Sequence, residues 1–112
     1  VMSSTITEEL IYSAAGVATP KEVKEVIELA FSNNFQKARD KLLETMLAHG
    51  LSGLDVIKQL QKEVLESGIE PKKKLFLIEK CGEIEFRMSE GADEFVQLEA
   101  LLSQIALAGL KD

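Results

Sequence analysis

The sequence contains no tryptophan, one tyrosine and five phenylalanines, so aromatic residues make up only 5% of its 112 positions. Leucine, isoleucine, valine and alanine must therefore fill most of its core. A single cysteine, Cys81, excludes an internal disulfide and indicates a reducing environment. No apolar run approaches the roughly 20 residues that span a bilayer, and residues 1–5 do not resemble a signal peptide. Met2 behind Val1 leads us to expect either a fragment of a longer protein or a residue left by cloning.

Positively charged residues are also in deficit, because 13 lysines and arginines stand against 19 aspartates and glutamates, for a net charge of −6. Attraction to phosphate dominates affinity for DNA and RNA, so this charge argues against independent nucleic-acid binding. The sequence has no Gly-Lys pair and therefore no phosphate-binding loop of the Gly-x-x-x-x-Gly-Lys type. One histidine and one cysteine cannot supply the ligands of a usual zinc site. We therefore expect no cofactor and no metal in this chain.

What the sequence does contain is a series of helical patterns. Apolar residues recur at three- and four-residue intervals, and no segment alternates apolar and polar residues over the length of a strand. We predict an all-α fold, a single bundle of about five to six helices in which residues 1–112 form one domain. The first expected helix runs from Thr7 to about Ala15, and a capping box from Thr19 to Glu22, with Pro20 inside it, starts the second. A break at 32–34 separates the second helix from the third, which ends at His49 and Gly50. The fourth starts at Ser52 and ends at Gly68, the fifth starts at Pro71, and a break at Gly91 separates it from the sixth.

Each expected helix after the first has one apolar stripe that should face the core. The predicted core residues, in chain order, are Val23, Val26, Ile27 and Ala30; Phe35, Ala38, Leu42, Met46 and Leu47; Leu54, Ile57, Leu60 and Val64; Leu77, Cys81, Ile84 and Met88; and Leu98, Leu102, Ile105 and Ala106.

The last predicted helix has more apolar surface than one buried face can hide. Outside its core stripe, further apolar residues project around the rest of the helix: Val96, Ala100, Leu101, Leu107 and Leu110. A helix that is apolar almost all round is covered on more than one side. In a chain this short, we expect part of that cover to come from another protein.

Two features invite a chemical interpretation, and each has a structural alternative. Cys81 and His49 are candidates for a nucleophile pair in a small enzyme, but Cys81 falls on an apolar stripe, where a free cysteine behaves as a small hydrophobe. Three cations at 72–74 are either a solvated turn or a contact for an acidic neighbour or DNA backbone. Gly82, inside a helix, is interpreted as a point where another helix comes close.

Arg87 is the polar residue that the pattern singles out. It lies within helical reach of Glu83 and Glu90, and Glu94 follows across the Gly91 break. A surface ion pair within one helix is worth only about 0.2–0.5 kcal/mol. Under a partner subunit, the same guanidinium would make a bidentate contact that fixes the register. The sequence allows both a surface ion pair and a contact with a partner subunit.

The amino-acid sequence of the last third of the chain also resembles that of a known family. Residues 83–94 read Glu-Ile-Glu-Phe-Arg-Met-Ser-Glu-Gly-Ala-Asp-Glu and are followed by Gln-Leu and Ala-Leu-Leu. This block is similar to the C-terminal domain of the small subunits of replication factor C, the sliding-clamp loader. Its sequence resembles the archaeal type of that subunit. The resemblance continues upstream in the same order at residues 6–12, 34–39 and 50–57.

The resemblance implies a collar domain that holds five ATPase subunits in a ring. ATP, Mg and the contacts with the sliding clamp and primer-template DNA would then belong to preceding AAA+ modules that this chain lacks. The chain itself would not be an enzyme. Its partners would be other small subunits and the large subunit, with homo-oligomers in isolation, no membrane contact, and a cytoplasmic location if archaeal or a nuclear one if eukaryotic.

On either argument, the expected interface lies on the last two helices. The candidate interface residues are Arg87, Glu90, Glu94, Gln97, Ala100, Leu101, Leu107 and Leu110. A stand-alone helical adaptor with no role in replication is the alternative function, and it predicts a monomer.

Overall fold

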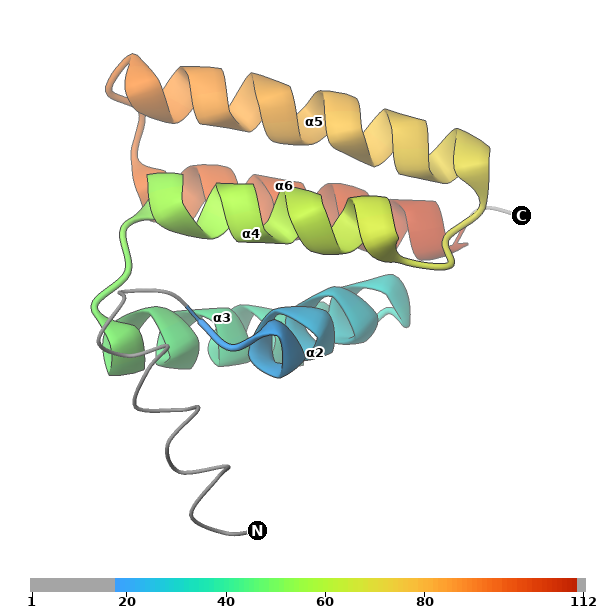
Figure 1. The fold of residues 1–112 in the computed structure, drawn as a ribbon, viewed down its shortest axis with the longest axis horizontal. Helices are drawn as coiled ribbons and strands as arrows, with labels where there is room; N and C mark the ends of the chain where they lie inside the picture. Colours follow the sequence, from blue (N-terminus) through green and yellow to red (C-terminus); the bar gives the residue numbers. More distant parts are fainter. Residues whose placement is uncertain (1–17, 111–112) are drawn as a thin grey trace, which may run out of the picture.

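A computed structural model describes residues 18–110, and within that range every regular element is an α-helix (Figure 1). The helix expected over residues 7–15 lies outside the described residues. The prediction of an all-α fold is confirmed. The helices are α2 (Pro20–Phe31), α3 (Phe35–His49), α4 (Gly53–Glu66), α5 (Pro71–Ser89) and α6 (Glu94–Leu110).

Local sequence chemistry explains where these helices begin and end. The Thr19 hydroxyl accepts the Glu22 N–H and the Glu22 carboxylate accepts the Thr19 N–H, so the predicted capping box opens α2. A similar reciprocal box at Ser52 opens α4. Gly50 ends α3 with a φ of 63°, a left-handed conformation that glycine adopts without strain. Helix α4 ends at Glu66, earlier than the predicted Gly68, because the backbone of Ser67 turns to an extended conformation; the Ser67 hydroxyl donates to the Val64 carbonyl at 2.7 Å.

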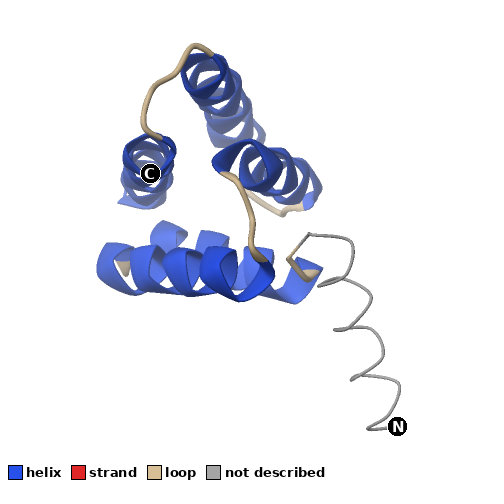
Figure 2. Ribbon diagram, turned by 90° about the vertical axis from the view of Figure 1, so that its left-hand side faces the viewer, coloured by secondary structure: helices blue, strands red, loops and turns tan. Residues whose placement is uncertain are grey.

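The five helices form two layers. Figure 1 shows α4, α5 and α6 running alongside one another, with α2 and α3 on one side of them. Figure 2 looks along α4, α5 and α6 and shows the α2–α3 pair lying across them. Helix α6 packs against each of the other four described helices, whereas α5 packs chiefly against α4 and α6. The side of α5 that faces away from the bundle is therefore left to solvent.

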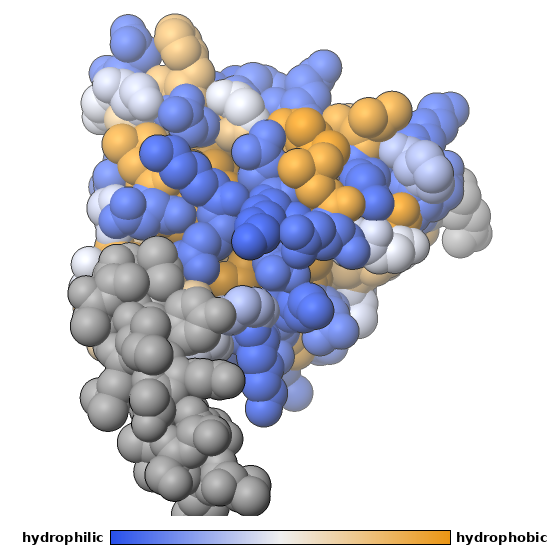
Figure 3. Space-filling view, in the orientation of Figure 1, coloured by the Kyte–Doolittle hydropathy of each residue, from blue (hydrophilic) through white to orange (hydrophobic). Residues whose placement is uncertain are grey.

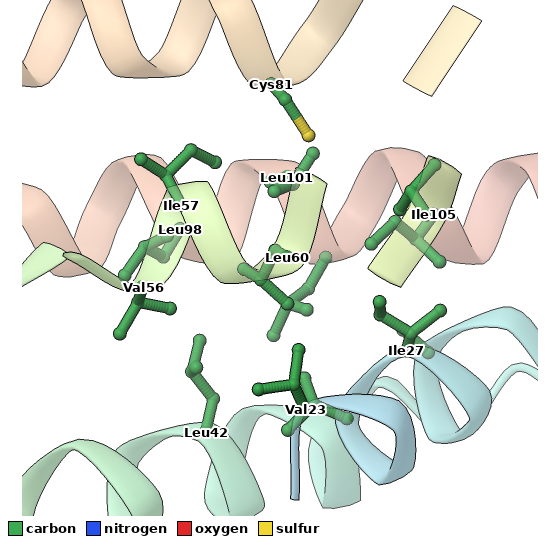
Figure 4. Close-up of a cluster of buried hydrophobic side chains, with 14 of the residues drawn as sticks. Val23, Ile27, Leu42, Val56, Ile57, Leu60, Cys81, Leu98, Leu101 and Ile105 are labelled. Carbon is green, nitrogen blue, oxygen red and sulfur yellow. The ribbon is translucent and has the colours of Figure 1, made fainter. Parts of the chain in front are cut away.

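The core lies between the two layers and is almost entirely aliphatic. In Figure 4, Val23 and Ile27 from α2 point toward the side chains that α4 and α6 contribute, and Cys81 enters the cluster from α5. The predicted stripe of α5 and that of α6 are confirmed: all eight residues are buried. Most of the predicted stripes of α2 and α4 are buried as well, with Leu54 partly so.

The predicted stripe of α3 is wrong at one position. Leu47 is 76% exposed, whereas Thr45 is buried. At 100° per residue, Leu47 lies about 140° around the helix from Leu42, so it points away from the core. Thr45 follows Leu42 by three residues and faces inward with it. An apolar residue next to a stripe was mistaken for a member of it.

The explanation given for Gly82 is also wrong. A Cβ atom built on Gly82 has nothing within 4 Å, and the residue is exposed. The close helix approach is at Gly109 in α6, where an added Cβ would lie 1.8 Å from the carbonyl oxygen of Phe31 at the end of α2. Because Gly109 has no side chain, the backbones of α6 and α2 can come this close.

A polar contact joins α2 and α3. His49, in the last turn of α3, places Nε2 2.9 Å from Oε1 and 3.1 Å from Oε2 of Glu22 in the first turn of α2. The His49 side chain is only 9% exposed. The sequence places His49 at the end of its helix, and the structure shows that it also contacts α2. Partial burial raises the pKa of Glu22, but hydrogen bonds from Thr19 and the His49 contact outweigh this and lower its pKa below the usual 4.5.

This lowered pKa predicts a loss of stability in acid. A carboxyl whose pKa is lower in the folded state stabilises the fold above its unfolded pKa and loses that contribution as the pH falls through the folded pKa. We therefore expect the free energy of unfolding to decline below about pH 4.5, and Glu22→Gln to reduce this decline. Urea unfolding between pH 3 and 7 measures it, with Glu79→Gln as an exposed control on α5. An unchanged pH profile in Glu22→Gln would contradict the assignment.

Candidate functional site

Catalytic chemistry finds no support in the described part of the chain. Among residues 18–110, no group of three or more His, Cys, Asp or Glu side chains is placed to hold a metal ion. Cys81 is 2% exposed, and burial raises the pKa of its thiol to about 11. At neutral pH such a thiol is protonated and shielded from substrates, so it does not suit a nucleophile. Within the same range, no helix combines the length and the apolarity that crossing a membrane requires.

The outward face of α6 carries a continuous stripe of apolar or small residues. Its members recur at intervals of four and three residues, which places them on one face of a helix. Three of them are large and well exposed: Val96 at 56%, Leu107 at 46% and Leu110 at 58%. This face, called here the α6 stripe, consists of Val96, Ala100, Ser103, Leu107 and Leu110. The opposite face of the same helix carries Leu98, Leu102 and Ile105, which are all fully buried.

Leu101 does not belong to this surface. It was expected at the interface, but its side chain is fully buried in the core (Figure 4). Leu101 lies three residues after Leu98 and four before Ile105, and this spacing puts all three on one side of the helix. Because α6 contacts four other helices, its buried side is wider than a single stripe. Leu101 is therefore a core residue and can contact no partner in the folded domain.

The polar interface candidates are placed in different surroundings. The Arg87 guanidinium lies 2.9 Å from Glu83 Oε1, as an i, i+4 pair on a half-exposed part of α5. Hydrogen bonding to Lys80 and the charge of Lys80 are the main causes that lower the pKa of Glu83, and Arg87 adds a smaller contribution. Glu90 is exposed just beyond the end of α5. Arg87 thus forms the surface ion pair with Glu83 that the sequence allows, and about half of its side chain remains exposed.

Glu94 and Gln97 lie closer to the core of the bundle. One oxygen of Glu94 accepts the backbone N–H of Gly53, at the start of α4, at 2.8 Å. This contact ties the start of α6 to the start of α4, so Glu94 has a structural role. The side-chain oxygen of Gln97 is buried without a hydrogen-bond partner. Neither residue is placed as openly as Arg87 or Leu107.

A groove between α5 and α6 adjoins the α6 stripe. It encloses about 520 Å³, and Phe76 and Leu107 supply apolar surface on its two sides. Lys72 and Lys73 line the same groove, and the ammonium of Lys73 also lies 5.7 Å from the ring centre of Phe31. The lysines at the start of α5 thus border a groove instead of forming only a solvated turn.

Sequence reasoning missed the outward face of α5. Leu75 is 68% exposed and Phe86 is 63% exposed, and the two are eleven residues apart on the side away from the core. Glu79 and Gly82 lie between them at the same helical spacing. The sequence does place Leu75 and Phe86 on one helix face, because steps of four, three and four residues lead from 75 to 86. The longer apolar stripe on the core side of α5 drew attention away from this face. In Figure 3, apolar surface appears as separate patches among hydrophilic side chains.

Comparisons with known proteins relate the sequence to one family. The family model of the replication factor C C-terminal domain matches residues 18–104. A replication factor C small subunit of Pyrococcus furiosus is 47% identical over 110 residues, which cover 98% of this chain and 13% of the relative. The small subunit of Sulfurisphaera tokodaii is 46% identical over 108 residues, 95% of this chain and 33% of that protein. The small subunit of Sulfolobus acidocaldarius is 47% identical over 104 residues, 91% and 32% respectively. The chain therefore spans no more than a third of the length of these three relatives.

Proposed function

Since this chain belongs to the replication factor C C-terminal domain family, we propose that it is the collar of a clamp-loader small subunit, the domain that holds the ring together. Five such domains would form a hub for the ATPase modules that load the sliding clamp onto primer-template DNA. ATP, Mg, the clamp and DNA would be bound by those modules, for which the additional length of the relatives leaves room. The organisms of the relatives favour an archaeal cytoplasmic protein.

The observation that carries this proposal is the uncovered α6 stripe. Three large apolar side chains on one helix face are about half exposed, although the other face of that helix is completely buried. Fully burying a side chain such as leucine or valine stabilises an assembly by about 1.5–3 kcal/mol. A neighbouring subunit that covers the stripe would gain this contribution several times over. Arg87, Glu90 and the groove beside Leu107 would then form the polar margin of the same interface.

The alternative functions fit the observations less well. A stand-alone adaptor without a role in replication explains the exposed stripe equally, but it does not explain why nearly the whole chain matches the replication factor C family. A small enzyme that uses Cys81 would need an accessible thiol with a lowered pKa, and the Cys81 thiol has neither property.

Leu107→Asp is expected to weaken self-association at least tenfold and to leave the helical content unchanged. A carboxylate at this position would have to lose its hydration when a partner covers the stripe. Sedimentation equilibrium over a wide concentration range measures the association, and circular dichroism at 222 nm measures the fold. The matched control is Leu47→Asp, the same substitution at a 76% exposed leucine of α3.

Three outcomes would contradict the proposed interface. One is equal association of wild type and Leu107→Asp, which would place the contact elsewhere. Another is a strict monomer of the wild type at every concentration, which would argue against self-association through α6 and favour the adaptor. The third is unfolding of Leu107→Asp, which would show that the outward side of α6 belongs to the core.

A further inference from the structure

A second cavity lies between α2, α4 and the loop that joins α4 to α5. It encloses about 500 Å³. Its apolar walls include Ile27 and Phe31 from α2 and Ile69 from the loop. None of the α6 stripe residues lines it. The cavity is therefore a separate feature of the molecule that the proposed interface does not use.

Glu63 makes this cavity unusual. It lines the cavity from α4, and only 7% of its surface is exposed. Its Oε2 atom is buried and has no hydrogen-bond partner. Carboxylates almost never become this buried unless they are paired, because an unpaired buried charge is costly. The fold therefore contains a buried acceptor without a donor, at the wall of a space that is large enough for a side chain.

The other charges around the cavity increase this imbalance. Glu28 and Glu66 line the cavity and are exposed at its edge, whereas Lys24 is the one cation among its described lining residues. Among the lining residues, three carboxylates thus stand against one ammonium, and the Lys73 ammonium lies nearby at the Phe31 ring. Lys24 does not donate to Glu63 Oε2, which has no hydrogen-bond partner. The local field favours an additional positive charge.

The combination of apolar walls and carboxylates matches one kind of side chain. Arginine and lysine bury an alkyl stem against apolar surface and direct a charged head toward acceptors. A guanidinium also pairs with a carboxylate through two parallel hydrogen bonds and stacks on aromatic rings. The Phe31 ring already accepts a cation, since the Lys73 ammonium lies 5.7 Å from its centre.

We propose that this cavity receives an arginine side chain from another protein chain, with Glu63 as its buried counter-ion. The alkyl stem would lie against Ile27 and Ile69, and the guanidinium would approach the Glu63 carboxylate from the cavity side. Glu66 would hold the outer side of the same charge. This inference does not depend on the proposed collar function, because it rests on different residues and a different face.

The test uses the complete 112-residue chain and two blocked tripeptides. One is acetyl-Gly-Arg-Gly-amide, and the other carries citrulline, a neutral analogue of arginine. Two-dimensional NMR follows the backbone amides of Ser67, Gly68 and Ile69 during each titration. We expect saturable shifts of these amides with the arginine peptide only. Glu63→Gln should weaken the binding about tenfold or more, since a hydrogen bond to a charged group is lost.

Two further variants complete the test. Glu63→Gln should fold normally, because glutamine has nearly the shape of glutamate and removes the charge of a side chain that is only 7% exposed. Glu66→Gln is exposed and should weaken binding to a smaller extent, whereas Glu79→Gln on the outward face of α5 should bind like wild type. The proposal is overturned if the citrulline peptide produces the same shifts, if Glu63→Gln binds as tightly as wild type, or if the shifted amides lie away from the cavity.

Discussion

Replacing Leu101 with alanine is expected to lower the free energy of unfolding by about 3–5 kcal/mol. Leu101 is fully buried at the middle of α6, the helix that contacts all the other described helices. The substitution removes apolar contacts and leaves a cavity. With helices packed on several sides of α6, the core cannot close this cavity by moving one neighbour alone.

Urea unfolding followed at 222 nm measures this loss, and Leu107→Ala is the matched control. The control makes the same change six residues later on the same helix, where the leucine is 46% exposed. We expect it to change the free energy of unfolding by less than about 1 kcal/mol in the monomer. Similar losses for the two variants would mean that α6 is not divided into a core side and an outward side.

Gly109→Ala is expected to destabilise the domain by about 2 kcal/mol or more, although alanine is the better helix former. The added Cβ would lie 1.8 Å from the backbone oxygen of Phe31 and 2.8 Å from its carbonyl carbon. These are backbone atoms, so no side-chain rotation relieves the clash. The last turn of α6 must move away from α2 and give up part of its packing.

Gly82→Ala is the internal comparison, and its expected effect has the opposite sign. Gly82 is exposed in the middle of α5, with nothing within 4 Å of an added Cβ. Alanine there should raise the free energy of unfolding by about 0.5–1 kcal/mol, because it restricts the unfolded chain and favours the helix. Thermal and urea unfolding of both variants check the pair. A destabilised Gly82→Ala, or a stabilised Gly109→Ala, would contradict the helix packing described above.

The sequence by itself determined the helices and most of their buried faces. The capping box at Thr19 and the left-handed Gly50 depend on a few neighbouring residues, so local reasoning located those ends. The stripe from Leu77 to Met88 follows from helical periodicity alone, and all four of its residues are buried. The exposure of Val96, Leu107 and Leu110 on α6 also followed from this periodicity.

Only the tertiary structure decided how many sides of each helix are covered and which residues meet across helices. The width of the buried side of α6 depends on its four neighbours, and this placed Leu101 in the core. The close approach at Gly109 depends on the crossing of α2 and α6, whose contacting residues lie far apart in the chain. The pairing of His49 with Glu22 and the unpaired carboxylate of Glu63 arise in the same way. A helical period fixes directions around one axis, whereas these contacts depend on where several axes lie relative to one another.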